Sequence, residues 1–162
     1  MPDPIASLPR SLGYEGYFGQ GSGPMPWNGA VAQLEACRNY FLCTANAEGR
    51  PHVMPVWALW MDDLLYFSTG ANSKKARNFR ANPEAVMTTD SADNPVIIEG
   101  RVETVSDAAT VSRFLAAYTA KYDWPMDASM GPFYALRPRL AFGMMQTPGA
   151  DGSPTRWEFQ AE

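Results

Sequence analysis

Histidine and cysteine are scarce in this chain, and this limits the chemistry that it can carry. Among 162 residues there are one histidine, His52, and two cysteines, Cys37 and Cys43. A His-rich metal site is therefore impossible. The remaining alternative is zinc held by two Cys, one His and a carboxylate, but the spacing matches no familiar zinc motif, so we expect no metal site. One histidine does not make a credible Ser-His-Asp triad, and no close carboxylate pair stands out beyond Asp62–Asp63. We predict no catalytic side chain and expect two free, semi-buried thiols.

Long apolar runs and an excess of basic residues are also missing. Without a run of about 18 apolar residues we expect no transmembrane helix, and residues 1–16 hold no apolar signal core. The 13 Lys and Arg residues are outnumbered by 17 Asp and Glu, which argues against nucleic-acid binding. We therefore expect a cytoplasmic protein that binds neither nucleic acid nor membrane. The hydrophobic share of 46% is enough for one folded domain with a real core.

The first 28 residues are rich in Gly, Pro and aromatic side chains and follow neither a helical nor a strand period. We predict an irregular N-terminal arm over residues 1–28. Its aromatic residues indicate that the arm packs on something, either its own domain or a partner subunit or site. These residues are Tyr14, Tyr17, Phe18 and Trp27.

Residues 29–162 have the pattern of a mainly β domain. Helices are predicted after a cap at Asn28 (29–38), over 74–82, and over 107–122, where an apolar stripe recurs at helical spacing. About seven strands are predicted, over 40–47, 51–61, 64–69, 84–90, 95–105, 139–146 and 155–160. The second is almost continuously apolar, which is typical of a strand buried on both sides. Short joins between strands favour a closed or partly closed antiparallel barrel with flanking helices.

Lys74 and Lys75 open the middle helix, directly after a possible cap at Asn72 or Ser73. Because a helix N-terminus carries partial positive charge, each lysine there costs about 0.3–1 kcal/mol. A bound phosphate would offset this cost, since free N–H groups and ammonium groups together attract anions. The alternative is a solvated basic face without a ligand. No GxxxxGK or GxGxxG loop is present, so the sequence favours neither a nucleoside triphosphatase nor a Rossmann domain.

The segment GRPHVMPVWALWMDDLLYFSTGANSKKARN (49–78), followed by VIIEGRVETV (96–105), resembles the split-barrel flavin-binding superfamily that includes pyridoxamine 5′-phosphate oxidase. The nearer resemblance is to its flavin- and deazaflavin-dependent oxidoreductases. It covers residues 35–105 well, and TRWEF (155–159) resembles the closing strand of that branch. The resemblance implies an FMN-binding-like antiparallel split β-barrel over residues 29–162. It also implies a homodimer with two cofactor sites at the subunit interface.

The resemblance further implies where a cofactor would bind. The flavin or deazaflavin ring would lie along the second strand, against Met54, Pro55, Val56 and Trp57. The phosphate side would be lined by Phe67, Ser68 and Thr69, with Ser73, Lys74, Lys75 and Asn78 at the helix start. Trp157 would either close the ring pocket from the partner subunit or simply pack.

Two departures from the family pattern bear on the cofactor and the reaction. Met54 stands where pyridoxamine phosphate oxidases carry a phosphate-binding arginine, and the chain has no Arg-x-His substrate motif. We therefore do not expect vitamin B6 oxidation, and we favour coenzyme F-420 over FMN. The expected function is hydride transfer to or from a small unsaturated or carbonyl-containing molecule. Alternatives are an FMN oxidoreductase of the same fold, or a non-catalytic flavin- or haem-binding protein with His52 as the haem ligand rather than an ordinary strand residue.

Overall fold

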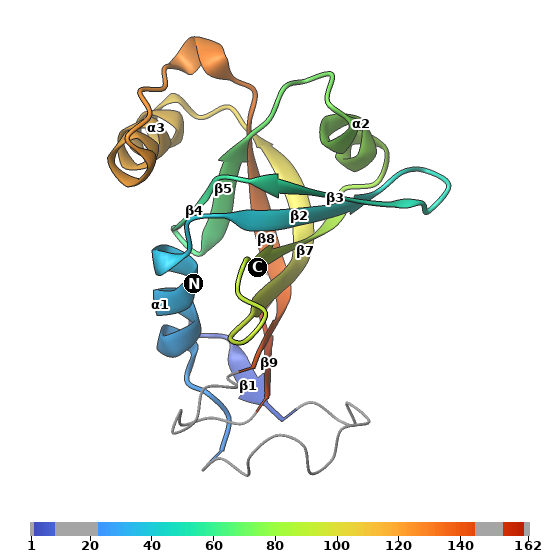
Figure 1. Cartoon of the computed structure of the whole chain (residues 1–162), viewed down its shortest axis with the longest axis vertical. Coiled ribbons are helices and arrows are strands. Elements are labelled where there is room, and N and C mark those ends of the chain that lie inside the picture. The colour runs from blue at the N-terminus through green and yellow to red at the C-terminus, as the bar shows by residue number, and fades with distance from the viewer. Residues whose placement is uncertain (1, 9–22, 145–153, 161–162) are drawn as a thin grey trace.

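The computed structural model describes residues 2–8, 23–144 and 154–160 (Figure 1). These residues form nine strands, three α-helices and one 3-10 turn. The strands are β1 (Ile5–Ser7), β2 (Tyr40–Ala45), β3 (Pro51–Val56), β4 (Ala58–Met61), β5 (Leu64–Ser68), β6 (Glu84–Thr89), β7 (Val96–Val105), β8 (Phe133–Gly143) and β9 (Thr155–Glu158). The helical elements are α1 (Trp27–Ala36), α2 (Lys74–Ala81), α3 (Ala108–Tyr122) and the turn η1 (Ala128–Met130).

One antiparallel sheet carries all nine strands, and it divides at β8. The main path runs β1-β9-β8-β7-β6-β2-β3. The first half of β8 also pairs with β5, from Phe133 to Leu136, whereas its second half pairs with β9 from Leu140 onward. Since β5 pairs with β4, and Trp57 alone separates β4 from β3, the sheet curls back on itself. The result is the predicted mainly β, antiparallel split barrel with helices around it (Figure 1).

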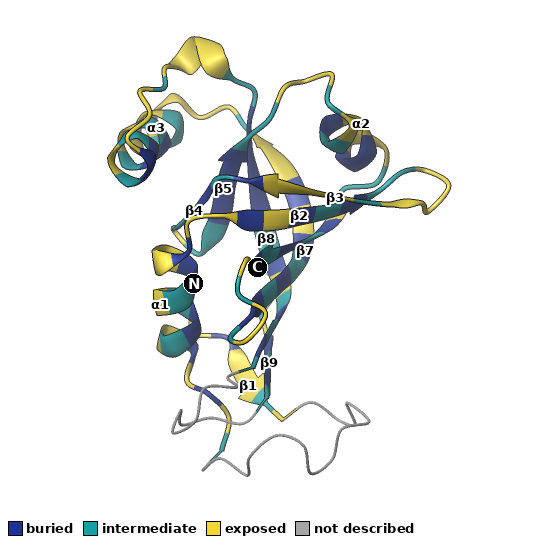
Figure 2. Ribbon diagram, in the orientation of Figure 1, coloured by how far each residue is buried: buried dark blue, intermediate teal, exposed yellow. Residues whose placement is uncertain are grey.

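Two apolar clusters fill the fold (Figure 2). The larger lies inside the barrel, where α1 contributes Ala30 and Leu34 to a core that includes Met87 and Ile98. The smaller lies beneath α3, which buries Phe114, Tyr118 and Tyr122 against β4, β5 and β8. The apolar stripe predicted for α3 thus faces this second cluster.

A close approach of two backbones requires glycine at Gly100 in β7. The pairing of β7 with β8 shifts register between Glu99 and Gly100. A Cβ atom added at Gly100 would lie 2.0 Å from the carbonyl oxygen of Arg137. Any side chain there would force the two strands apart, so this glycine permits the bulge.

Three predictions about local structure are corrected. Residues 51–61 do not form one strand buried on both sides; they form β3 and β4, and most of β3 is exposed because it pairs with β2 alone. Asn28 does not cap α1, which begins at Trp27 after Pro26 and has no side-chain cap. The N-terminal arm is not wholly irregular, because Ile5–Ser7 pairs with β9 as β1.

Other predictions about the arm and the late strands lie outside the described residues. These include the packing of Tyr14, Tyr17 and Phe18, and the structure of residues 145–153. The division of the chain at residue 28 stays a prediction, although Trp27 already belongs to α1 and to the core.

Candidate functional site

Of the two predicted caps, Asn72 and Ser73, it is Ser73 that caps the N-terminus of α2. The Ser73 hydroxyl accepts a hydrogen bond from the Ala76 N–H at 3.1 Å. Thr69, directly after β5, donates its hydroxyl to Ser73 Oγ at 3.2 Å. These two contacts fix the loop before the helix, so the position of the lysines that follow is set by the fold.

Lys74 is exposed and Lys75 half-buried at this helix start. Within residues 2–8, 23–144 and 154–160, neither lysine forms an ion pair with an acidic side chain. The helix also has no acid in its first turn. Two ammonium groups therefore stand at the positive end of α2 without neutralisation, as an anion site requires.

A buried hydrogen bond holds α2 against the β2–β3 hairpin. Asn78 Nδ2 donates to Thr44 Oγ1 at 2.9 Å, and Thr44 Oγ1 lies 3.4 Å from the His52 carbonyl oxygen, to which it donates. Asn78 and Thr44 are 4% and 5% exposed, so this polar contact is sealed from water. The link brings the start of β3 and the start of α2 to one corner of the molecule.

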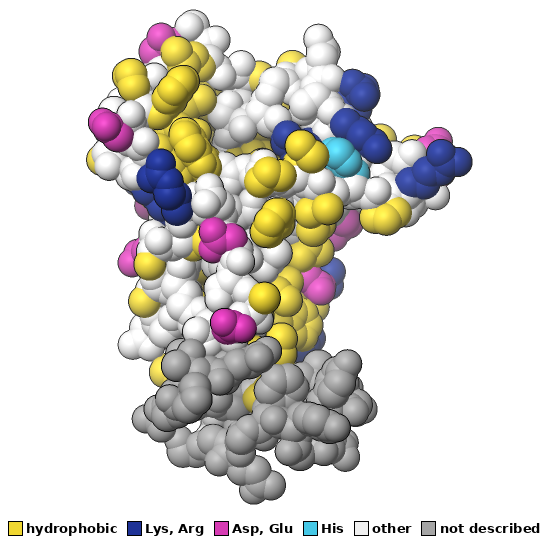
Figure 3. Space-filling model, viewed as in Figure 1, with side chains coloured by type: hydrophobic (Ala, Val, Ile, Leu, Met, Phe, Trp, Pro, Cys, Tyr) yellow, Lys and Arg dark blue, Asp and Glu magenta, His cyan; other side chains and the backbone are white. Residues whose placement is uncertain are grey.

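His52 faces the two lysines at this corner. In Figure 3 the single histidine, in cyan, lies against dark blue Lys and Arg side chains. Partial desolvation, followed by the charges of Lys74 and Lys75, lowers the pKa of His52 below its usual 6.5. The imidazole is therefore neutral at pH 7 and adds a hydrogen-bonding group to the basic corner.

The strand β3 offers an open backbone edge beside this corner. It ends the sheet path, so among the described strands only β2 pairs with it. Met54 is 42% exposed and Pro55 is also exposed, whereas Val56 is buried. A planar ring with hydrogen-bonding edges fits such a strand, because unpaired backbone groups and apolar side chains lie together.

Trp57 marks the other end of this strand. Its ring stacks on Tyr122 with centroids 4.6 Å apart and an interplanar angle of 7°. The Tyr122 hydroxyl accepts from the Ala58 N–H at 3.0 Å, and Lys121 Nζ donates to the Ala58 carbonyl at 3.3 Å. The end of α3 thus fixes the kink between β3 and β4.

Two side chains predicted to bind cofactor, those of Phe67 and Asn78, are buried or already engaged. Phe67 is 0% exposed and packs on Phe79 and Tyr134, so only its backbone is available. The Asn78 amide is engaged with Thr44 and serves to position α2.

Trp157 packs in the core of its own chain, and its role in closing a ring pocket of a partner subunit stays a prediction. It is 0% exposed and packs against Trp27 with ring centroids 5.3 Å apart. Trp157 pairs with Ala141 of β8, whereas Ser68 pairs with Phe133 of the same strand. Ala141 and Phe133 are eight residues apart. At about 3.3 Å per residue this is about 26 Å, so Trp157 does not reach the corner in its own chain.

The predicted hydroxyl donors are used within the protein. Ser68 Oγ donates to the Pro132 carbonyl at 3.1 Å, and the Thr69 hydroxyl is engaged with Ser73. An incoming anion would therefore meet chiefly the two lysines and His52. Sequence reasoning missed His52 at this place, because only the pairing of β2 with β3 turns it toward α2.

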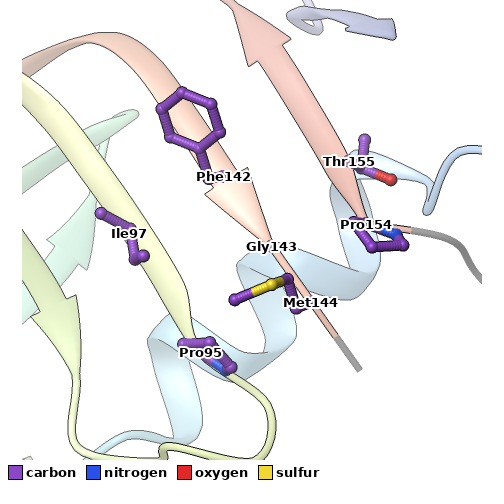
Figure 4. Close-up of a pocket in the computed structure, with 7 residues that line it drawn as sticks. All are labelled: Pro95, Ile97, Phe142, Gly143, Met144, Pro154 and Thr155. Atoms are coloured by element: carbon purple, nitrogen blue, oxygen red, sulfur yellow. The ribbon is translucent and has the colours of Figure 1, made fainter. Parts of the chain in front are cut away.

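A cavity away from this corner is unsuited to an anion. A cavity of about 130 Å³ lies at the far end of β7 and β8, where β9 begins (Figure 4). Its lining is almost wholly apolar: Pro95, Ile97, Phe142, Gly143, Met144, Pro154 and Thr155. The one hydroxyl there, that of Thr155, accepts from the Met25 N–H at 2.7 Å.

Two features are absent from the part of the chain that the structure describes. No group of three or more His, Cys, Asp or Glu side chains is arranged to hold a metal ion there. No helix in that part is both long enough and apolar enough to cross a membrane. Cys37 and Cys43 are free thiols, as predicted, with Cys37 buried.

Comparisons with solved structures return flavin, deazaflavin and haem proteins of one fold. An F420 reductase superposes with a TM-score of 0.55 at 26% identity, covering 68% of this chain and 93% of its own. A FAD-binding protein from Mesorhizobium loti gives 0.61 at 20% identity, over 84% and 96% of the two chains. HutZ, the haem storage protein from Vibrio cholerae, gives 0.57 at 14% identity, over 68% and 88%.

No protein among those with curated functions matches the chain. The family model described as pyridoxamine 5′-phosphate oxidase matches residues 29–154, which is most of the chain and nearly all of the barrel. The chain therefore belongs to the pyridoxamine 5′-phosphate oxidase family of split-barrel proteins.

Proposed function

We propose that this protein is an oxidoreductase that uses the deazaflavin coenzyme F-420 to transfer hydride to or from a small unsaturated or carbonyl-containing molecule. The observation that carries the proposal is the pair Lys74 and Lys75, which has no acidic partner within the described residues. The F420 reductase at 26% identity supports the choice of cofactor.

The residues of the corner would divide the work of binding. Lys74 and Lys75 would hold the cofactor phosphate, and the open edge of β3 around Met54 and Pro55 would orient the ring. F-420, when bound, supplies the hydride chemistry. Met54 offers no positive charge where an arginine would bind an FMN phosphate, which favours F-420 over FMN. We assign no side chain as proton donor.

We further propose that two copies associate through the outer face of the sheet. The strand pairing aligns Val53 with Cys43 and Cys43 with Val86, and places Phe41 beside them on the same face. Val53 and Phe41 are 53% and 40% exposed, which is high for apolar side chains on adjacent strands. A twofold-related copy would cover this face, because an isologous contact is self-complementary.

Titration of the purified protein with F-420 and with FMN tests the proposal. We expect F-420 to bind more tightly than about 100 μM, which corresponds to roughly −5.5 kcal/mol. Failure of both cofactors at that concentration would rule the function out. A yellow protein with flavin absorbance on purification would instead favour the FMN oxidoreductase.

A non-catalytic haem-binding protein is the second candidate, and the fold shared with HutZ together with the partly exposed His52 favours it. Haem bound through this imidazole would give a Soret band that His52→Ala abolishes. A Soret band that survives this substitution, or the absence of haem binding, argues against it.

A further inference from the structure

His52 and Lys74 lie on the facing sides of two different elements, β3 and α2. Thr44 and His52 are paired residues of β2 and β3, so their side chains lie on one face of the sheet. That face looks toward α2, because Thr44 Oγ1 accepts the hydrogen bond from Asn78. Lys74 precedes Asn78 by four residues and therefore shares its face of the helix. The imidazole and the ammonium group thus lie on the facing sides of β3 and α2, where the charge of Lys74 lowers the pKa of His52.

The charged groups that act on His52 are both cations. From α2 these are Lys74 and Lys75, and from β2 the directly opposing residue is the non-ionisable Thr44. None of the three basic side chains forms an ion pair with a carboxylate in the described parts of the chain. Protonating His52 would therefore add a third positive charge to an uncompensated pair. This arrangement disfavours the imidazolium until an anion arrives.

We propose that His52 is a third, proton-dependent ligand of the anion that Lys74 and Lys75 hold, so that anion binding at this corner takes up a proton. The inference rests on the proposed function, because it assigns a regulation to the same site. The anion offsets the lysine charges, the imidazole accepts one proton from the solvent, and the resulting imidazolium donates a hydrogen bond to the anion. His52 thereby supplies part of the positive charge that an arginine would provide at the position of Met54.

The coupling has a definite direction with pH. In the free protein the pKa of His52 lies below 6.5, so the imidazole is neutral at pH 7 and above. A bound anion raises this pKa. The affinity for the anion therefore increases as the pH falls, first through the pKa of His52 in the bound protein and then through its pKa in the free protein. An opposite charge in contact moves a pKa by about one unit or more. One unit corresponds to about a tenfold gain in affinity at acidic pH.

The single histidine allows a direct test by proton NMR. The imidazole C–H signals come from His52 alone, so their pH titration needs no assignment. The titration is compared in sodium chloride and in sodium sulfate at equal ionic strength, because sulfate keeps its charge over pH 5–8. We expect the pKa of His52 to be about one unit higher in sulfate. Identical values in the two salts would overturn the inference.

Matched variants separate the lysines from general charge effects. In Lys74→Ala/Lys75→Ala, the pKa of His52 in chloride should rise toward 6.5 and the difference between the salts should vanish. Arg80→Ala removes one charge from the exposed end of the same helix and should leave the difference intact. A double variant that retains the sulfate effect would contradict the inference.

This test is distinct from the cofactor titration. If F-420 and FMN both fail to bind while sulfate still raises the pKa of His52, the proposed function is wrong and the anion site stands. If a cofactor binds while sulfate leaves the pKa unchanged, the function stands and His52 takes no part.

Discussion

Asn78 donates a hydrogen bond to Thr44 at 2.9 Å, and this buried contact joins the helix that carries the basic pair to the strand hairpin that carries His52. Both side chains are almost wholly buried, so the contact is protected from competing water. Because Lys74 lies one turn before Asn78, the same bond sets the distance between the lysines and β3. Asn78 is itself predicted to bind the cofactor. In the structure it positions Lys74 and Lys75, the residues that we propose to bind the cofactor phosphate.

Replacing Asn78 by Ala should lower the free energy of unfolding by about 1–3 kcal/mol, since it removes a buried hydrogen bond and leaves a small cavity. Urea denaturation measures the change. Thr44→Val provides the partner variant, and the double variant should cost less than the sum of the two single ones. Strictly additive effects would show that the two side chains do not interact.

Lys75→Ala should weaken cofactor binding by about 1.5–3 kcal/mol, because a hydrogen bond from a charged donor to phosphate is lost. The dissociation constant of F-420, measured by fluorescence at pH 7.5, reports the change. Arg80→Ala removes a charge from the opposite end of α2 and should have little effect. An affinity that Lys75→Ala leaves unaltered would mean that this lysine is merely solvated.

The kink between β3 and β4 yields a prediction about stability. Tyr122→Phe removes the hydroxyl that accepts the Ala58 N–H, leaving a buried donor unpaired. The expected loss is about 1–3 kcal/mol in the free energy of unfolding, measured by thermal or urea denaturation. Tyr118 forms no hydrogen bond through its hydroxyl within the described residues, so Tyr118→Phe is the matched control. Equal losses in both variants would contradict this role for the hydroxyl.

Local signals in the sequence were sufficient where a few adjacent residues decide the structure. The cap at Ser73 and the end of α2 before Pro83 are set by side chains within one turn. The tight turn at Asp62–Asp63, where both residues have positive φ, is likewise decided by two adjacent residues. These features depend on short-range hydrogen bonds and backbone preferences, which the sequence states directly.

Features that depend on distant neighbours were harder to predict. The apolar run over residues 51–61 does not reveal how many strands flank it, although Pro51 and Pro55 are typical of an edge strand. The place of Trp157 depends on the partner of β9, which lies far away in sequence. The same holds for His52, whose approach to α2 results from the register of β2 with β3.

Gly100→Ala should destabilise the barrel strongly, because its Cβ would lie 2.0 Å from the Arg137 carbonyl oxygen and 3.1 Å from Pro138 Cα. Backbone atoms cannot move aside as a flexible side chain can, so we expect a loss of several kcal/mol or failure to fold. Gly70→Ala is the control, since nothing lies within 4 Å of its added Cβ. The measurements are soluble yield and melting temperature. A Gly100→Ala protein as stable as the control would show that the β7–β8 bulge is not closely packed.

The proposed dimer predicts that a charge on the outer sheet face will separate the subunits. Phe41 is 40% exposed on β2, next to the edge strand β3, and Phe41→Glu would place a carboxylate between two apolar faces. Sedimentation should then change from dimer to monomer, and cofactor affinity should fall if the partner completes the site. Ile5 is 56% exposed on β1, which lies at the other end of the sheet path from β3, so Ile5→Glu should remain dimeric. If Phe41→Glu sediments as the parent protein does, this face is not the interface. If the parent protein is itself a monomer, the proposed cofactor site must be complete within one chain.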